Sequence, residues 1–198
     1  MQEKLTRRSN KARTHATRAA LIAAARECFV EKGYAETGTP EIVAKAGVTR
    51  GALYHHFDDK ADVLRAVVVR EAQAVAAQIE RETAKGASAT DTLMAGVDAY
   101  FAAMAAAGRA HLLLVEGPSI LGHAEMHRID RETGGETLRQ GFSFAMPKGV
   151  LKSVPLDALA ELLSAAFDRA ALAIAEGEPV DGYRAAVRMI LTGLLETA

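Results

Sequence analysis

One segment, from residue 37 to residue 64, constrains the fold of this chain more than any other, because it specifies two short helices, a tight turn and the start of a third helix. Thr39 is placed to cap the first helix, and Pro40 suits its first turn because the N–H that proline lacks has no intrahelical partner there. Gly47 can end this helix in the left-handed conformation, and Thr49 is placed to cap the next one. The spacing therefore predicts one helix on each side of a turn at Gly47.

The second of these helices, expected over residues 50–57, carries two kinds of side chain. Leu53 and Phe57 lie four residues apart and form an apolar stripe that we expect to be buried. The other faces carry side chains that can donate hydrogen bonds to DNA, namely Arg50, Tyr54, His55 and His56. A helix of this size fits the major groove of B-DNA, so the segment predicts a helix-turn-helix DNA reader. The alternative is a solvated helix face without a partner.

Nine residues of the segment stand in a characteristic order, at Ile42, Ala46, Gly47, Val48, Leu53, Tyr54, Phe57, Lys60 and Leu64. This order resembles the DNA-binding signature of the TetR family of transcriptional regulators, with Leu64 one residue late and Val43 where alanine is usual. Residues 24–34 also resemble the family's first helix and its end. The resemblance covers about the first third of the chain, and the remainder is similar only in being helical.

The resemblance implies an all-α fold with an N-terminal three-helix helix-turn-helix domain and a C-terminal helical domain for ligand binding and dimerisation. It implies a one-component regulator, most often a repressor, that binds a palindromic operator in double-stranded DNA as a homodimer. A small-molecule inducer would release the protein from DNA. It would do so by shifting the long fourth helix and changing the separation of the recognition helices from the roughly 34–36 Å between successive major grooves.

The resemblance also implies which residues contact DNA. Residues that match the family's DNA contacts are Thr39, Thr49, Arg50, Gly51, Tyr54, His55 and Lys60. Hydroxyl, phenol and ammonium groups among them are placed to hold phosphates, whereas Arg50 could form a bidentate pair with guanine. Pro40 stands where family members often carry a polar residue, so we expect base reading to depend on Arg50 and His55.

Charge is distributed unevenly along the chain. Residues 1–65 carry 12 basic and 8 acidic side chains, whereas residues 66–198 carry 12 basic and 17 acidic ones. Ordinary scatter can produce such a difference, but it also suits an N-terminal part that binds nucleic acid. We expect a basic flexible arm over residues 1–16, which either follows the DNA backbone or is only a solvated tail. The helix-turn-helix domain should then span residues 17–62 and the ligand-binding and dimerisation domain residues 63–198.

Apolar periodicity and helix-ending residues predict the remaining helices, and no strand-like alternation is present. A first helix should run over residues 17–32 and end at Gly33. Pro118 should interrupt a helix that holds residues 112–115, and residues 147–155 should form a loop. The other helices are expected over residues 60–84, 88–107, from 123 through 142, 156–176 and 181–197. The helix over residues 60–84 would be the only continuous link between the two domains.

A ligand pocket is expected among the middle helices. The candidate lining residues are Tyr100, Met104, Leu113, Glu116, His123, Met126 and Phe167. Aromatic rings and methionines give an adaptable apolar wall, so a hydrophobic or aromatic compound suits this lining better than a sugar or a nucleotide. Glu116 interrupts an apolar run and is either a polar anchor for the ligand or a residue on an exposed face.

The family resemblance implies a dimer interface in which the last two helices of each subunit form a four-helix bundle. Apolar residues on these helices are the candidates, at Leu159, Leu163, Phe167, Val187, Leu191 and Leu194. Two other classes of function remain open. One is an activator, or a regulator that needs no ligand, with the same DNA-binding residues. The other is a helical enzyme with an incidental helix-turn-helix.

The sequence offers little for the enzyme alternative. Residues 117–121 lack the second glycine of a hydrolase nucleophile elbow, and the pair His123 and His127 has no obvious third metal ligand nearby. We therefore expect no catalytic residues, no metal and no cofactor. Cys28 is the single cysteine, which rules out an intramolecular disulfide and fits a reducing cytoplasm. Charges interrupt every apolar run before it reaches membrane-spanning length, so no membrane partner is expected.

Overall fold

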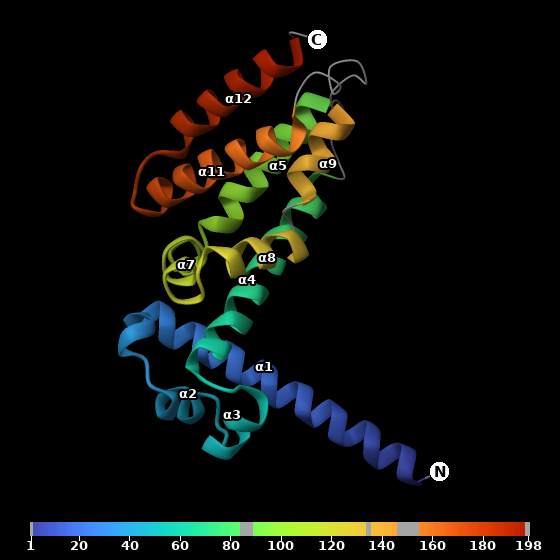
Figure 1. The fold of residues 1–198 in the computed structure, drawn as a ribbon, viewed down its shortest axis with the longest axis vertical. Coiled ribbons are helices and arrows are strands. Elements are labelled where there is room, and N and C mark those ends of the chain that lie inside the picture. Colours follow the sequence, from blue (N-terminus) through green and yellow to red (C-terminus); the bar gives the residue numbers. More distant parts are fainter. Residues whose placement is uncertain (1, 84–88, 134–135, 146–154, 197–198) are drawn as a thin grey trace.

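The computed structural model describes residues 2–83, 89–133, 136–145 and 155–196, and the regular elements over these residues are all helices (Figure 1). The predicted all-α fold is therefore confirmed. The elements are α1 (Gln2–Glu36), α2 (Thr39–Lys45), α3 (Arg50–His56), α4 (Lys60–Thr83), α5 (Ala89–Met104), α6 (Arg109–His111), η1 (Leu112–Glu116), α7 (Gly117–Leu121), α8 (His123–Thr133), α9 (Glu136–Ala145), α11 (Leu156–Ala175) and α12 (Val180–Glu196).

Helix α1 begins earlier than the sequence indicated. We expected an arm over residues 1–16 and a helix from residue 17, but the backbone is helical from Gln2, and this first part of α1 projects away from the other helices (Figure 1). Residues 1–16 have no apolar stripe, yet they include good helix formers, and extending an existing helix costs less than nucleating one. The predicted end at Gly33 is confirmed, because Gly33 interrupts the helix with φ 80° and ψ 164°.

The two helices of the predicted helix-turn-helix are present as α2 and α3. Thr49 caps α3 as predicted, since its hydroxyl accepts a hydrogen bond of 3.2 Å from the backbone N–H of Ala52. The predicted cap from Thr39 is wrong. Gly38 adopts the extended conformation of the cap position, so Thr39 is already the first helical residue, and no side chain caps α2.

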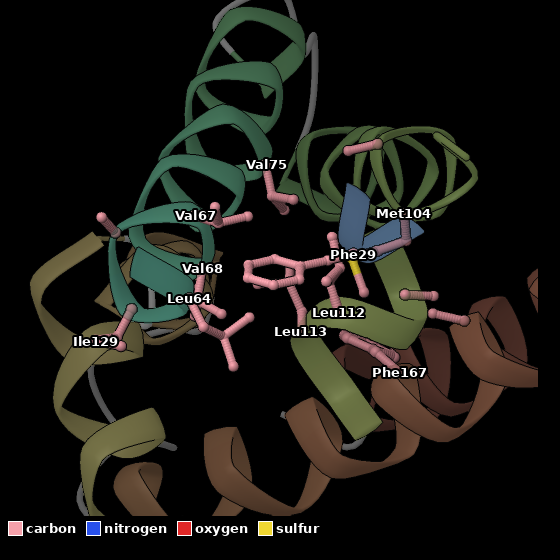
Figure 2. Packing of buried hydrophobic residues seen from close by; sticks show 14 of the residues in the cluster. Phe29, Leu64, Val67, Val68, Val75, Met104, Leu112, Leu113, Ile129 and Phe167 are labelled. Atoms are coloured by element: carbon pink, nitrogen blue, oxygen red, sulfur yellow. The ribbon is translucent and has the colours of Figure 1, made fainter. Parts of the chain in front are cut away.

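A continuous apolar core joins the helix-turn-helix to the rest of the chain. Figure 2 shows the ring of Phe29, from α1, between Leu64 and Val68 of α4 and the pair Leu112 and Leu113 of η1. Helix α4 spans almost the predicted range and contacts α1, α5 and α8. A movement of α4 or η1 must therefore be felt at α1, because close-packed interiors transmit displacements.

The segment around Pro118 departs from regular α-helix, as predicted, and does so by a π-helical turn. In η1 the N–H of Gly117 donates to the carbonyl of Leu112, five residues earlier, instead of four. Pro118 follows in the first turn of α7, where its missing N–H leaves no gap in the hydrogen bonding. The turn places Glu116 at the end of the π-helical segment, against the helix-turn-helix.

The backbone after α5 lies close to a side chain of α1 at Gly108. Gly108 follows α5 with φ 72°, and a Cβ atom at this position would lie 2.5 Å from Cγ2 of Val30 in α1. Only glycine fits both the left-handed backbone and the available space. The N-terminal and C-terminal parts of the chain are thus in direct contact at a second place besides the core around Phe29.

The late helices follow the sequence prediction closely. Helices α11 and α12 begin and end within one residue of the predicted ranges, and α9 and α11 pack beside α5. The predicted loop over residues 147–155 lies, up to residue 154, outside the described residues.

Candidate nucleic-acid interface

The predicted DNA-contacting residues of α2 and α3 form one exposed surface. Tyr54 is 46% exposed, and its hydroxyl lies 3.5 Å from the hydroxyl of Thr39. The guanidinium of Arg50 stacks on the same ring at 5.4 Å from its centre. The hydrogen bond with Thr39, followed by that with Arg50, lowers the pKa of Tyr54. The structure therefore brings a hydroxyl, a phenol and a guanidinium together, all suited to contacts with DNA.

The other predicted contacts on α3 are also accessible. Thr49, Gly51 and His55 are exposed and share the solvent side of the helix with Arg50. Leu53 is fully buried on the opposite side, as the sequence predicted. Next to it, His56 is half-buried, and burial, then the nearby charges of His55 and Arg18, lower the pKa of its imidazole. The half-buried His56 is therefore less accessible to a phosphate than its exposed neighbour His55.

Lys60 has protein partners for its ammonium. Its Nζ donates to the backbone carbonyls of Tyr34 at 2.8 Å, Thr37 at 2.9 Å and Ala35 at 3.4 Å. The ammonium also lies 4.2 Å from the centre of the Tyr34 ring. A phosphate contact by Lys60 stays a prediction, and it would require the ammonium to leave these carbonyls. The carbonyls that become free after Gly33 attract a cation, a signal that sequence reasoning overlooked.

A buried ionic cluster connects the N-terminal and C-terminal parts. Glu71 of α4 is 4% exposed, and its two oxygens accept hydrogen bonds from Nε of Arg26 at 2.9 Å and Nε of Arg109 at 2.7 Å. The same arginines donate to the carbonyls of Ala107 and Ala103. Burial alone would raise the pKa of Glu71, but the hydrogen bonds and charges of the two arginines outweigh it, and the pKa is lowered. The carboxylate thus ties α1, α4 and α6 together while ionised.

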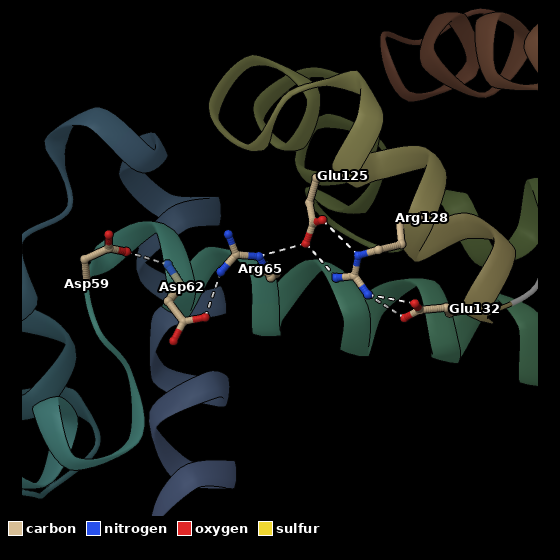
Figure 3. A network of polar contacts seen from close by, with 6 residues as sticks. All are labelled: Asp59, Asp62, Arg65, Glu125, Arg128 and Glu132. Atoms are coloured by element: carbon tan, nitrogen blue, oxygen red, sulfur yellow. Dashed lines mark hydrogen bonds and ion pairs between the residues drawn. The ribbon is translucent and has the colours of Figure 1, made fainter.

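A second polar network joins the start of α4 to α8 (Figure 3). Arg65 donates from Nε to Glu125 at 2.8 Å and from Nη1 to Asp62 at 2.8 Å. Glu125 also accepts from Arg128, which in turn pairs with Glu132. Hydrogen bonding by Arg128, outweighing a small effect of burial, lowers the pKa of Glu125 to about 2. Most of these groups are partly exposed, so the network orients α8 on α4 more than it stabilises the fold.

Four of the predicted ligand-binding residues, Tyr100, Met104, Leu113 and Phe167, belong to one interior region. Met104, Leu113 and Phe167 are buried in the core cluster, and Tyr100 packs against them. The rings of Tyr100 and Phe167 lie 6.5 Å apart, and the phenol donates to Oδ1 of Asp168 at 2.5 Å. Burial raises the pKa of Asp168. Sequence reasoning missed this carboxylate, which is the polar group at the end of an aromatic wall.

The remaining ligand candidates lie elsewhere. Met126 is half-buried and His123 is exposed at the start of α8, so a ligand contact by either residue stays a prediction. Glu116 faces the end of α1, where it accepts a hydrogen bond from the backbone N–H of Tyr34 at 2.7 Å. A cleft of ≈ 440 Å³ lies outside the predicted region, between α1 and α4. It is lined by His15, Arg18, Ala19, Ile22, Asp62, Arg65, Ala66, Val69, Arg70 and Gln73.

The predicted dimer residues pack mostly within their own chain, and their place in an interface stays a prediction. Leu163, Phe167, Val187 and Leu191 are already buried against helices of their own chain, and Leu159 and Leu194 are half-buried against the same core. The apolar residues that these helices leave exposed are Leu162, Met189 and Ile190, with 71%, 73% and 47% exposure. Both faces of α11 and α12 carry apolar residues, and the packing on α5, α6 and α9 determines which face is covered.

The described part of the chain shows neither a group of metal-ligating side chains nor a membrane-spanning helix. Among its His, Cys, Asp and Glu side chains, no three lie close enough together to hold a metal ion. None of the described helices is both long and apolar enough to cross a bilayer.

Comparisons with known proteins agree with this geometry. Residues 21–67 match the family description "Bacterial regulatory proteins, tetR family", and residues 90–198 match "Tetracyclin repressor-like, C-terminal domain". The transcriptional repressor BepR of Brucella suis is 43% identical over 63 residues, which are 32% of this chain and 30% of that protein, so this match spans less than a third of the relative. The TetC protein of transposon Tn10 from Escherichia coli is 30% identical over 149 residues, which are 74% of each chain.

A solved structure extends the likeness over nearly the whole chain. The TetR-family transcriptional regulator from Pectobacterium atrosepticum superposes with a TM-score of 0.71 and 28% identity, and the match covers 93% of this chain and 96% of that one. This family consists of transcriptional regulators and not of enzymes. With its helix-turn-helix and both matching regions, this chain belongs to the TetR family of transcriptional regulators.

Proposed function

We propose that this regulator is a homodimeric repressor that binds a palindromic operator through α3 and is released by a small, largely apolar ligand. The observation that carries the proposal is the exposed surface formed by Thr39, Arg50 and Tyr54 on an intact helix-turn-helix frame. Phosphate contacts by the hydroxyl and the phenol would fix the protein on the duplex, and Arg50 would read a base. Of the similar proteins, BepR is named a repressor and FasR of Mycolicibacterium smegmatis an activator, so the sign of the regulation is the part of this proposal that a reporter gene must decide.

A dimer follows from the small size of the recognition helix, because two half-sites are needed to reach specific affinity. The exposed apolar side chains of Leu162, Met189 and Ile190 supply a surface that a second copy would cover. The two α3 helices would then enter successive major grooves on one side of the DNA. Binding to an operator, dimerisation with a second copy and a location in the cytoplasm are all parts of this proposal.

The ligand would bind near Tyr100 and Phe167, where aromatic rings end at the polar pair formed by Tyr100 and Asp168. Such a wall suits a hydrophobic or aromatic compound that offers one polar group to this pair. Because α5 packs on α4, a ligand that separates them would shift α4 and change the distance between the recognition helices. An activator, or a regulator without ligand, would use the same DNA surface, and a reporter gene behind the operator would distinguish these alternatives by the sign of the response.

Selection of bound duplexes from a random DNA library tests the proposal. We expect the protein to enrich an inverted repeat whose half-sites have centres about 10–10.5 base pairs, or a multiple of this spacing, apart. The reason is that the two-fold symmetry of a dimer imposes the same symmetry on its site. Enrichment of a single half-site, without a symmetric partner, would contradict the dimeric mode. Failure to enrich any sequence would contradict specific DNA binding.

A further inference from the structure

The connection between α1 and α2 is held by one residue from each of two distant elements. Because Gly33 breaks the helix, the N–H of Tyr34 leaves the helical hydrogen-bond ladder and donates instead to Oε1 of Glu116, at 2.7 Å. The carbonyl of the same residue accepts from Nζ of Lys60 at 2.8 Å. We call these three residues, Glu116, Tyr34 and Lys60, the Tyr34 clamp.

The two carboxylate oxygens of Glu116 have different surroundings. Of these, Oε2 is buried and has no hydrogen-bond donor among the described residues. A Cβ atom at position 33 would lie 3.2 Å from Oε1, so the carboxylate would have to shift by a few tenths of an ångström to make room for it. Burial of a carboxylate oxygen without a donor costs solvation energy, and the one hydrogen bond of the other oxygen offsets this cost only in part. The contact therefore adds little to the stability of the fold. Its position at the end of the π-helical segment points to a role in transmission.

The clamp leads directly to the DNA-binding surface. After Tyr34, the buried Thr37 donates from its hydroxyl to the carbonyl of Gly33 at 2.8 Å, and its own carbonyl accepts from Lys60. Two residues further along, α2 begins with Thr39, whose hydroxyl meets that of Tyr54 on α3. A displacement of Tyr34 therefore moves the start of α2 and the phosphate-facing groups on it.

We propose that Glu116 is a positioning residue, which couples the π-helical segment η1 to the recognition surface through the backbone N–H of Tyr34. The proposal rests on the DNA-binding function and adds the route by which the C-terminal helices control it. A π-helical turn holds one residue more than the α-helical turn that it replaces, so its conversion to α-helix shifts the register of neighbouring residues. Any rearrangement of residues 112–116 then moves Glu116 and changes its hydrogen bond with the N–H of Tyr34.

Amide hydrogen exchange of the full chain tests the contact itself. In Glu116→Met we expect the N–H of Tyr34 to exchange about 10-fold faster or more, because it loses its acceptor. Glu116→Gln keeps an acceptor oxygen and should change the rate much less. Glu132→Met is the matched control, since it replaces an exposed glutamate of α8 that pairs only with Arg128 among the described contacts. An unchanged Tyr34 rate in Glu116→Met, or equally faster exchange throughout α11 and α12, would overturn the proposal.

The coupling is tested with DNA as the second ligand. The probe is the duplex that the wild-type protein selects from the random library. Binding of this duplex should slow exchange at residues 112–116 of the wild type, since a coupling between two sites acts in both directions. In Glu116→Met the same duplex, bound at saturation, should leave these residues unaffected. A response that persists in this variant would refute the coupling, whereas a wild type that selects no duplex would refute the DNA-binding function and the coupling with it. The library selection distinguishes these two failures, because only the second leaves the wild type without a selected duplex.

Discussion

Replacement of Glu71 by glutamine will lower the free energy of unfolding by about 3–5 kcal/mol, the usual loss when one partner of a buried ion pair is removed. The variant keeps the shape of the side chain but leaves Arg26 and Arg109 without their shared counter-charge, and these side chains are only 26% and 13% exposed. Urea unfolding followed by circular dichroism measures the change. Glu80→Gln, at an exposed position of α4, is the control, for which we expect less than about 0.5 kcal/mol.

The pH dependence of this difference has a fixed sign. The pKa of Glu71 is lowered in the folded state, so its contribution to stability is complete above the unfolded value, about 4.3, and is lost as pH falls below it. The gap between wild type and Glu71→Gln should therefore be largest at neutral pH and narrow below about pH 4.3. A gap that stays constant down to the acid unfolding limit would show that Glu71 is not held ionised by the two arginines.

We expect a charge introduced on the exposed apolar face of α11 and α12 to abolish the proposed dimer. Met189→Asp and Leu162→Asp each place a carboxylate in the proposed interface, where an unpaired charge costs several kcal/mol. We expect a folded monomer in sedimentation, with operator affinity reduced by about 100-fold or more and only weak, salt-sensitive DNA binding left. Ile120→Asp makes the same chemical change at an exposed apolar residue of α7 and should leave the dimer intact.

Phe167→Asp completes the comparison, because Phe167 is buried within its own chain. This variant should lose its fold instead of forming a stable monomer, and thermal unfolding would separate the two outcomes. If Met189→Asp and Leu162→Asp both remain dimeric and bind the operator normally, the interface lies on another surface and the assignment of this face is wrong.

Local signals predicted the helix-turn-helix well. The ends of α3 and the positive φ of Gly47 depend on residues only a few positions away, and both were correct. The predicted start of α1 was wrong, because a helix can extend through residues such as 2–16 that have no apolar stripe. Apolar periodicity likewise located α4, α11 and α12 within one residue.

Long-range packing determined what the sequence did not reveal. Which apolar face of α11 and α12 is covered depends on α5, α6 and α9, so Leu163 and Leu162 could not be separated by spacing alone. The family resemblance predicts a DNA contact for Lys60, and the position of Glu116 in an apolar run predicts a ligand contact. Their partners, the backbone groups of Tyr34, are far away in sequence and become available only because Gly33 breaks the helix.

The most direct test of the DNA-reading surface compares the binding of wild type, Arg50→Ala and Tyr54→Phe across the random library. Arg50→Ala should lose preference at one base pair of each half-site, at a cost of about 1–3 kcal/mol for the preferred sequence. Tyr54→Phe should weaken binding to all sequences alike, because a phosphate contact carries no base information. An Arg50→Ala profile that keeps the full wild-type preference would contradict the assignment of α3 as the helix that reads the operator.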